Sequence, residues 1–168
     1  MRFAMRIILP ALLLFLLLFT ACSDSNDPVT DPLSGSFTTA FDLIPLEFTE
    51  EGEIAIADTP IEMEGNFAGF GAVNGTIDQQ VDFTVIPTGM AGTARYVLSD
   101  GDEIHTSFEA TSSFPDEDNV ITFEGVHTIT GGTGRFVEAT GEAALEGTGN
   151  LATMTGAFTL DGTITYTP

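Results

Sequence analysis

The sequence lacks lysine altogether and has a single cysteine, Cys22. One cysteine cannot form an intramolecular disulfide. The folded domain must therefore be stabilised by its core alone, even in an oxidising compartment outside the cytoplasm. Four basic residues oppose 25 acidic ones. A surface of this charge repels nucleic acid and anionic lipid headgroups, so DNA and RNA are excluded as partners. The same self-repulsion indicates a saline or divalent-rich medium, in which the melting temperature should rise with salt.

A hydrophobic run long enough to cross a membrane is also missing. The apolar stretch from Ile7 to Ala21 falls short of the roughly 20 residues that a membrane-spanning helix needs, and Pro10 interrupts it. The basic start MRFAMR, the apolar run and the small residues after it are typical of an export signal. We therefore expect residues 1–21 to be a cleaved signal peptide.

The four residues FTAC, Phe19 to Cys22, resemble a bacterial lipobox, with Phe19 in place of the usual leucine. This resemblance implies cleavage before Cys22 and a diacylglycerol on its sulfur; an ordinary secretory signal with an unused thiol is the alternative. The lipid, not charge, would then hold the protein at a membrane. Ser23 does not match an aspartate-based inner-membrane retention signal. The expected location is the cell envelope, at the outer membrane or cell surface.

After the cysteine the composition changes twice. Residues 22–35 are rich in Asp and Pro without an aromatic, which predicts a flexible tether. Residues 36–168 lack helical periodicity and show short alternating runs between turn signals, which predicts an all-β domain. Eight or nine strands favour an antiparallel β-barrel over a sandwich. The expected strands are Phe37–Phe48 with a break at Pro45, Ile54–Ala57, Ile61–Phe70, Thr76–Ile86, Thr93–Leu98, Glu103–Ser112, Val120–Thr130, Phe136–Glu146 and Met154–Tyr166.

Two dipeptides predict tight turns, Asn74-Gly75 and Asp100-Gly101. Pairing across the second places Arg95 and Val97 on one face with Ile104, Thr106, Phe108 and Ala110, and this face is the expected core. Arg95 would lie at its rim, where it either pairs with a carboxylate or receives an anionic ligand. Ala94, Tyr96 and Leu98 would share the other face with Glu103, His105, Ser107 and Glu109.

The glycine-rich stretch HTITGGTGRFVEATGEAALEGTG, His127 to Gly149, is the most distinctive part of the chain. It has no lysine and leads into a strand, so it does not match a phosphate-binding loop or a dinucleotide fingerprint. Glycine at strand ends and bends instead relieves crowding in a small barrel and lets an aromatic such as Phe136 cover the bare backbone. The structural signature comprises Gly131, Gly132, Gly134, Phe136 and Gly141.

The segments TITGGTGRFVEATGEA and GAFTLDGTITY resemble the closing strands of the allene oxide cyclase and dirigent barrel superfamily, particularly its bacterial secreted members. EGNFAGFGAVNG and YVLSDGDEIHTSFEATS are similar to segments upstream of that signature, so the resemblance covers about Ser34 to Pro168. It implies a calycin-like, eight-stranded antiparallel barrel with a lumen open at one end. Homotrimers are frequent among the plant members. The acidic and aromatic site motifs of those members are not found, so no catalytic residue is carried over.

Other site patterns in the chain are weak. Glu103, His105 and Glu109 are candidate metal ligands on one strand face, against the alternative of an ordinary polar face. Glu124 and His127 are three residues apart on a regular strand, so they point to opposite sides. No GxSxG elbow supports a serine hydrolase, and the acidic loops do not follow the calcium-loop pattern. No cofactor is expected.

Three function classes follow from these observations. A non-catalytic barrel that binds a small hydrophobic ligand, or contacts envelope partners with its outer face, is favoured. An isomerase or cyclase acting in the lumen is the alternative, with Arg95, Glu124 and Tyr166 as the candidate ligand-contacting residues. In the third class the barrel is a packed structural spacer. Its interior would be filled by Phe83, Phe108, Phe123, Phe136 and Phe158.

Overall fold

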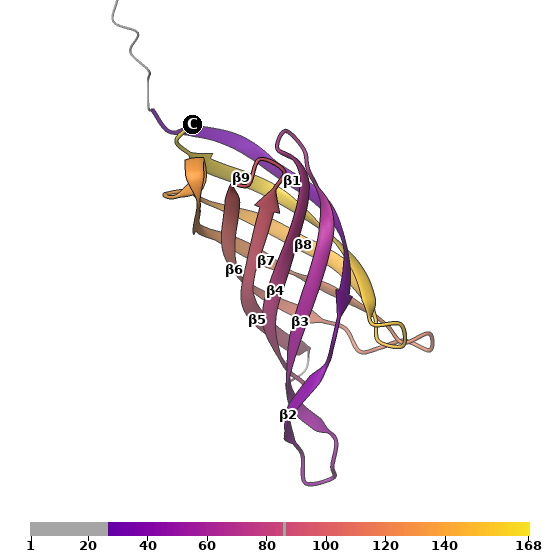
Figure 1. Ribbon diagram of the computed structural model, residues 1–168. Helices are drawn as coiled ribbons and strands as arrows, with labels where there is room; N and C mark the ends of the chain where they lie inside the picture. The colour runs from indigo at the N-terminus through magenta and orange to yellow at the C-terminus, as the bar shows by residue number, and fades with distance from the viewer. Residues whose placement is uncertain (1–26, 86) are drawn as a thin grey trace, which may run out of the picture.

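The protein is an antiparallel β-barrel in the computed structural model, which describes residues 27–85 and 87–168 (Figure 1). The predicted signal peptide and Cys22 lie outside these residues. In the described part of the chain, no helix has the length and apolar character needed to cross a membrane. The elements are β1 Val29–Phe41, β2 Ile44–Phe48, β3 Ile54–Phe67, β4 Gly71–Asp82, β5 Thr88–Leu98, β6 Glu103–Ser112, β7 Val120–Gly132, the 3-10 helix η1 Gly134–Phe136, β8 Thr140–Asn150 and β9 Thr155–Tyr166.

Eight strands close the barrel and one extends it. The sheet order is β1-β9-β8-β7-β6-β5-β4-β3-β2, and pairing of β1 with β3 completes the circle. β1 pairs with the second half of β3, from Ile61 to Phe67, whereas β2 pairs with its first half, from Ile54 to Asp58. The hairpin of β2 and β3 therefore projects beyond one end of the barrel (Figure 1). The predicted all-β barrel of about eight strands is confirmed.

Inward side chains fill the barrel unequally along its axis. Phe37 lies at the centre of an aromatic cluster, with ring centroids 5.1 Å from Phe67, 5.5 Å from Tyr96 and 4.8 Å from Phe158. Toward the end that carries η1, Phe70, Phe136 and Tyr166 pack against one another. We call this the closed end. The opposite end carries the β2–β3 hairpin and the connections after β4, β6 and β8, and we call it the open end.

Several predicted boundaries differ from those observed. Val29 to Gly35, which the composition assigned to the tether, form the start of β1 and pair with β9. The two runs on either side of Thr59 are one continuous strand, β3. Phe136 lies in η1 and not in a strand. In each case the tertiary structure, and not local composition, determines whether the segment is a strand. The first two segments pair with distant strands, and Phe136 lies in the turn that covers one end of the barrel.

One of the two predicted turns is wrong. Asn74-Gly75 lies in the middle of β4, and the chain turns instead at Ala68 to Phe70, where Gly69 has a φ of +85°. A Cβ at position 75 would lie 2.2 Å from the backbone oxygen of Arg95 on β5. Gly75 is therefore needed for close strand approach, and the dipeptide signal does not distinguish this from a turn.

The Asp100-Gly101 turn is confirmed, but the predicted facing across it is wrong by one residue. Val97 pairs with Glu103, and Tyr96 pairs with Ile104. The loop contains three residues, Ser99 to Gly101, and Gly101 has a φ of +92°, as expected for a three-residue hairpin with a left-handed position. Tyr96 therefore faces the core with Ile104, while Arg95 is on the outer face.

Candidate ligand cavity in the open half of the barrel

A cavity of about 500 Å³ occupies the open half of the barrel. This volume lies within the range of roughly 300 to 1,000 Å³ that is usual for small-molecule sites. All eight barrel strands contribute to its wall, and most of the lining side chains are apolar. They include Phe41, Ile61, Ile77, Val81, Met90, Phe108, Phe123, Leu145, Leu151, Met154 and Phe158.

The floor of the cavity is formed by the aromatic cluster and by a buried histidine. Phe158 belongs both to the cavity wall and to the cluster around Phe37. His127 on β7 is only 1% exposed, and its ring stacks on Phe108 with centroids 4.8 Å apart and planes 10° from parallel. The interior is thus packed in the closed half and hollow in the open half.

His127 belongs to a short buried polar chain. Its Nδ1 lies 2.8 Å from the hydroxyl oxygen of Thr106 and 3.4 Å from that of Tyr96. Its Nε2 has no hydrogen-bond partner among the described residues. Burial lowers the pKa of His127 to about 4, because the imidazolium form loses hydration in this environment. The ring is therefore neutral at neutral pH.

A second polar atom in the cavity wall is unpartnered. The hydroxyl of Thr59, on β3, is buried without a hydrogen-bond partner in the described structure. Native proteins satisfy most buried polar side-chain atoms, so two unsatisfied atoms in one cavity indicate groups that a ligand or water completes.

The cavity carries little charge. Glu53, which is exposed in the β2–β3 hairpin, is the one charged side chain among the described lining residues. Both arginines outside the predicted signal lie elsewhere, Arg95 on the outer face and Arg135 beside η1. The wall therefore offers no cation to an anionic ligand.

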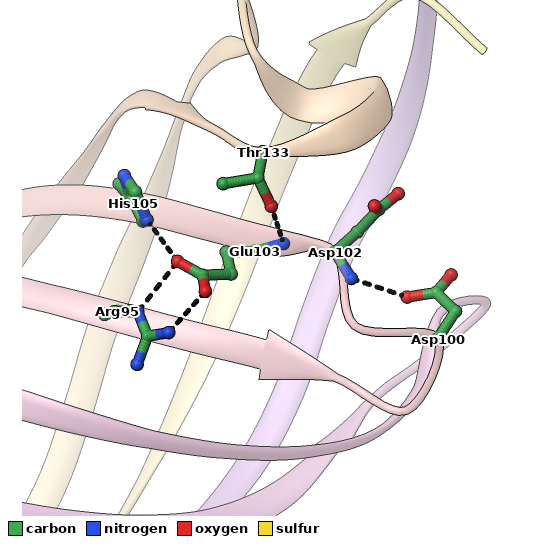
Figure 2. A network of polar contacts seen from close by, with 6 residues as sticks. All are labelled: Arg95, Asp100, Asp102, Glu103, His105 and Thr133. Atoms are coloured by element: carbon green, nitrogen blue, oxygen red, sulfur yellow. Dashed lines mark hydrogen bonds and ion pairs between the residues drawn. The ribbon is translucent and has the colours of Figure 1, made fainter.

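Arg95 lies in a surface network on the outer face, not at the rim of the core. Figure 2 shows its guanidinium directed at the carboxylate of Glu103, which also contacts Nε2 of His105 at 2.8 Å. The hydrogen bonds from Arg95 and then His105 lower the pKa of Glu103 to about 2. The backbone N–H of Glu103 donates to the hydroxyl of Thr133, which ties β6 to the segment before η1. The predicted pairing of Arg95 with a carboxylate is thus observed.

The other candidate residues do not line the cavity. Glu124 is exposed on β7, and Tyr166 lies at the closed end, where its hydroxyl donates to Asp31 at 2.9 Å. Glu103 and His105 are in contact, but Glu109 lies further along β6 opposite Ala91 and Val126. Within residues 27–85 and 87–168, no three His, Cys, Asp or Glu side chains come together as a metal site. The predicted site residues are therefore not assembled into one site.

No protein-family model matches the sequence, and no curated protein matches it. The pterocarpan synthase dirigent protein PsPTS1 superposes with a TM-score of 0.55 at 16% identity, over 83% of this chain and 97% of that one. GePTS1, another pterocarpan synthase dirigent protein, superposes with a TM-score of 0.51 at 12% identity, over 84% and 93%. The fold is the dirigent-type β-barrel. The predicted resemblance to that superfamily is confirmed at the level of fold.

In this dirigent-type barrel, the glycine-rich signature builds the closed end. Gly134 starts η1 with a φ of +56°, and a Cβ there would lie 1.9 Å from a carboxylate oxygen of Asp102. This turn directs Phe136 into the barrel, where it is fully buried. Arg135 stacks 4.8 Å above the Phe136 ring and pairs with Asp100 at 3.0 Å. The signature is thus a structural cap and lies at the end opposite the cavity.

Sequence reasoning missed His127 as a site residue, although a signal was present. Phe123, Gly125, His127 and Ile129 alternate with exposed residues along β7, and this period places His127 on the inner face. Its partners Tyr96 and Thr106 come from β5 and β6, and the wrong facing across Asp100-Gly101 separated them. A correct register would have brought all three together.

Proposed function

We propose that this protein binds a small, largely apolar molecule in the open half of its barrel and performs no chemistry on it. The cavity of about 500 Å³ supports this proposal most directly, because an apolar wall with a few polar groups is typical of small-molecule sites. The fold likeness supports a barrel whose interior is available to a ligand. The two proteins with this fold are named pterocarpan synthases. At 12% and 16% identity, we do not assign a synthase activity to the present protein.

The two other function classes have less support. A packed spacer requires phenylalanines throughout the interior, but Phe83 is 38% exposed and Phe123 is only partly buried. Phe108, Phe136 and Phe158 do fill interior positions. The isomerase or cyclase alternative relied on Arg95, Glu124 and Tyr166, none of which lines the cavity.

Filling the cavity tests the proposal. Gly149 faces the lumen, and a Cβ there would meet only side-chain atoms, Ile121 at 3.3 Å and Phe41 at 3.9 Å. Gly149→Phe should therefore fold and weaken saturable binding of the fluorescent apolar probe N-phenyl-1-naphthylamine about tenfold or more, since the ring takes the probe's volume. Fluorescence titration measures the change.

The matched control is Ala144→Phe, which adds a similar ring to the outer face of the same strand. This variant should bind the probe like the wild type. Equal affinity in all three proteins, or no saturable binding by the wild type, would refute a ligand site in the cavity.

We further propose that a diacylglycerol on Cys22 anchors the domain in the cell envelope, at the outer membrane or cell surface. Support comes from the FTAC stretch and from the location of the only cysteine at the expected cleavage point. Cys22→Ala should release protein from the membrane fraction or leave an uncleaved precursor, whereas Ser23→Ala should not. Membrane fractionation measures retention, and intact mass shows whether the precursor is cleaved. Equal membrane retention of both variants would disprove lipidation.

A further inference from the structure

The buried polar chain in the barrel determines which nitrogen of His127 carries the proton. Tyr96, Thr106 and His127 are 0%, 2% and 1% exposed, so solvent does not complete their hydrogen bonds. Tyr96 and Thr106 each have a hydroxyl proton to donate, and burial of a donor without an acceptor is unfavourable. The three polar groups must therefore satisfy one another.

Both hydroxyl protons find an acceptor within this chain only when Nδ1 of His127 accepts one of them. The hydroxyl groups of Tyr96 and Thr106 also contact each other, and this hydrogen bond opposes the rise in the Tyr96 pKa caused by burial. Nδ1 lies 2.8 Å from the Thr106 hydroxyl and 3.4 Å from the Tyr96 hydroxyl, so one hydroxyl donates to the other and the second donates to Nδ1. Because Nδ1 acts as acceptor, the neutral ring carries its proton on Nε2. A proton on Nδ1 would leave one hydroxyl hydrogen of the chain without an acceptor.

Nε2–H is therefore a donor that lacks a partner among the described residues, on a side chain of the cavity wall. Its complement is a hydrogen-bond acceptor on the bound molecule. A carboxylate fits poorly, because the wall offers no cation and burial of an unpaired charge is far costlier than burial of a neutral dipole. A carbonyl oxygen accepts the hydrogen bond and brings no donor that would need a partner of its own.

We propose that the cavity is selective for an uncharged, mainly apolar molecule with a carbonyl oxygen, which accepts a hydrogen bond from Nε2–H of His127. This inference rests on the proposed ligand-binding function and names its ligand class. The hydroxyl groups of Tyr96 and Thr106 keep Nδ1 as the acceptor, so that Nε2 carries the proton, and Phe108 fixes the ring plane by stacking. The apolar wall holds the rest of the molecule.

The test compares two probes of equal chain length, 2-nonanone and nonanoate, as competitors of N-phenyl-1-naphthylamine at pH 8. Wild-type protein should bind the ketone about tenfold or more tightly than the carboxylate. His127→Phe keeps a ring that stacks on Phe108 but removes the donor, so its affinity for the ketone should fall about tenfold while the fluorescent probe still binds. His105→Phe, at the half-buried histidine of the outer face, is the matched control and should leave the ketone affinity unchanged.

The outcomes separate the two proposals. Failure of the fluorescent probe to bind wild type defeats the ligand site itself. Probe binding together with equal affinities for ketone and carboxylate, or with equal ketone affinity in wild type and His127→Phe, overturns the carbonyl inference alone. If His127→Phe does not fold, two-bond ¹H–¹⁵N spectra of the wild-type protein identify the protonated nitrogen of His127. A proton on Nε2, with His127 signals that shift when 2-nonanone is added, supports the inference. A proton on Nδ1 contradicts it.

Discussion

Replacing Phe136 with alanine should lower the free energy of unfolding by about 3–5 kcal/mol, the range seen when a buried aromatic side chain is removed. Phe136 is fully buried at the closed end, with its ring centroid 5.0 Å from that of Tyr166 and 5.7 Å from that of Phe70. Arg135 covers the other side of the ring. The surrounding strands are hydrogen-bonded on both sides and have little freedom to collapse into the void. Urea unfolding followed by circular dichroism measures the change.

The neighbouring residue provides the control for this prediction. Val137 is 63% exposed, so Val137→Ala should change stability by no more than about 0.5 kcal/mol. If Phe136→Ala unfolded at the same urea concentration as Val137→Ala, η1 would not act as a cap. Because the cap and the cavity are at opposite ends, folded Phe136→Ala protein should still bind the fluorescent probe.

Acidification should destabilise the wild type more than a His127→Gln variant. The pKa of His127 falls from 6.5 in the unfolded chain to about 4 in the folded one. Between these values the unfolded state binds the proton and the folded state does not, so stability falls as the pH falls from about 6.5 to 4 and levels off below that. At 1.36 kcal/mol per pKa unit, the full difference is about 3 kcal/mol.

A comparison of variants is needed because the many carboxylates also titrate in this range. Their contribution is common to the wild type and His127→Gln, so it cancels in the difference between the two stabilities at each pH. If the stability difference between wild type and His127→Gln stayed constant from pH 7 to pH 4, the pKa of His127 would not be lowered in the folded protein, and the prediction would be wrong.

Local sequence patterns predicted the strands well but not how the strands pair. Glu103–Ser112 was predicted to the residue, because alternation of inward and outward side chains runs through its whole length. Asn74-Gly75 was mistaken for a turn, because the close approach of Arg95 that requires glycine comes from a neighbouring strand. The one-residue error at Asp100-Gly101 exchanged the two faces of β5. Register depends on loop geometry, which a dipeptide does not specify.

The cavity was harder to predict than the barrel. Its volume depends on which inward side chains are large in each half, and those residues come from all eight strands. Phe37, Phe67 and Tyr96 meet in the middle of the barrel only after closure pairs β1 with β3. The unpartnered Nε2 of His127 follows from this packing. Alternation along β7 predicts that His127 points inward, but its partners on β5 and β6 require the observed register.

Backbone chemical-shift mapping during titration with 2-nonanone would locate the ligand site in the barrel. Saturable ¹H–¹⁵N shifts are expected at amides of the cavity wall, such as Ser112, Gly149 and Gly156, while Gly134 at the closed end should be unaffected. Shifts confined to the outer surface, or no shift up to the solubility limit of the ketone, would contradict a ligand site in the open half of the barrel.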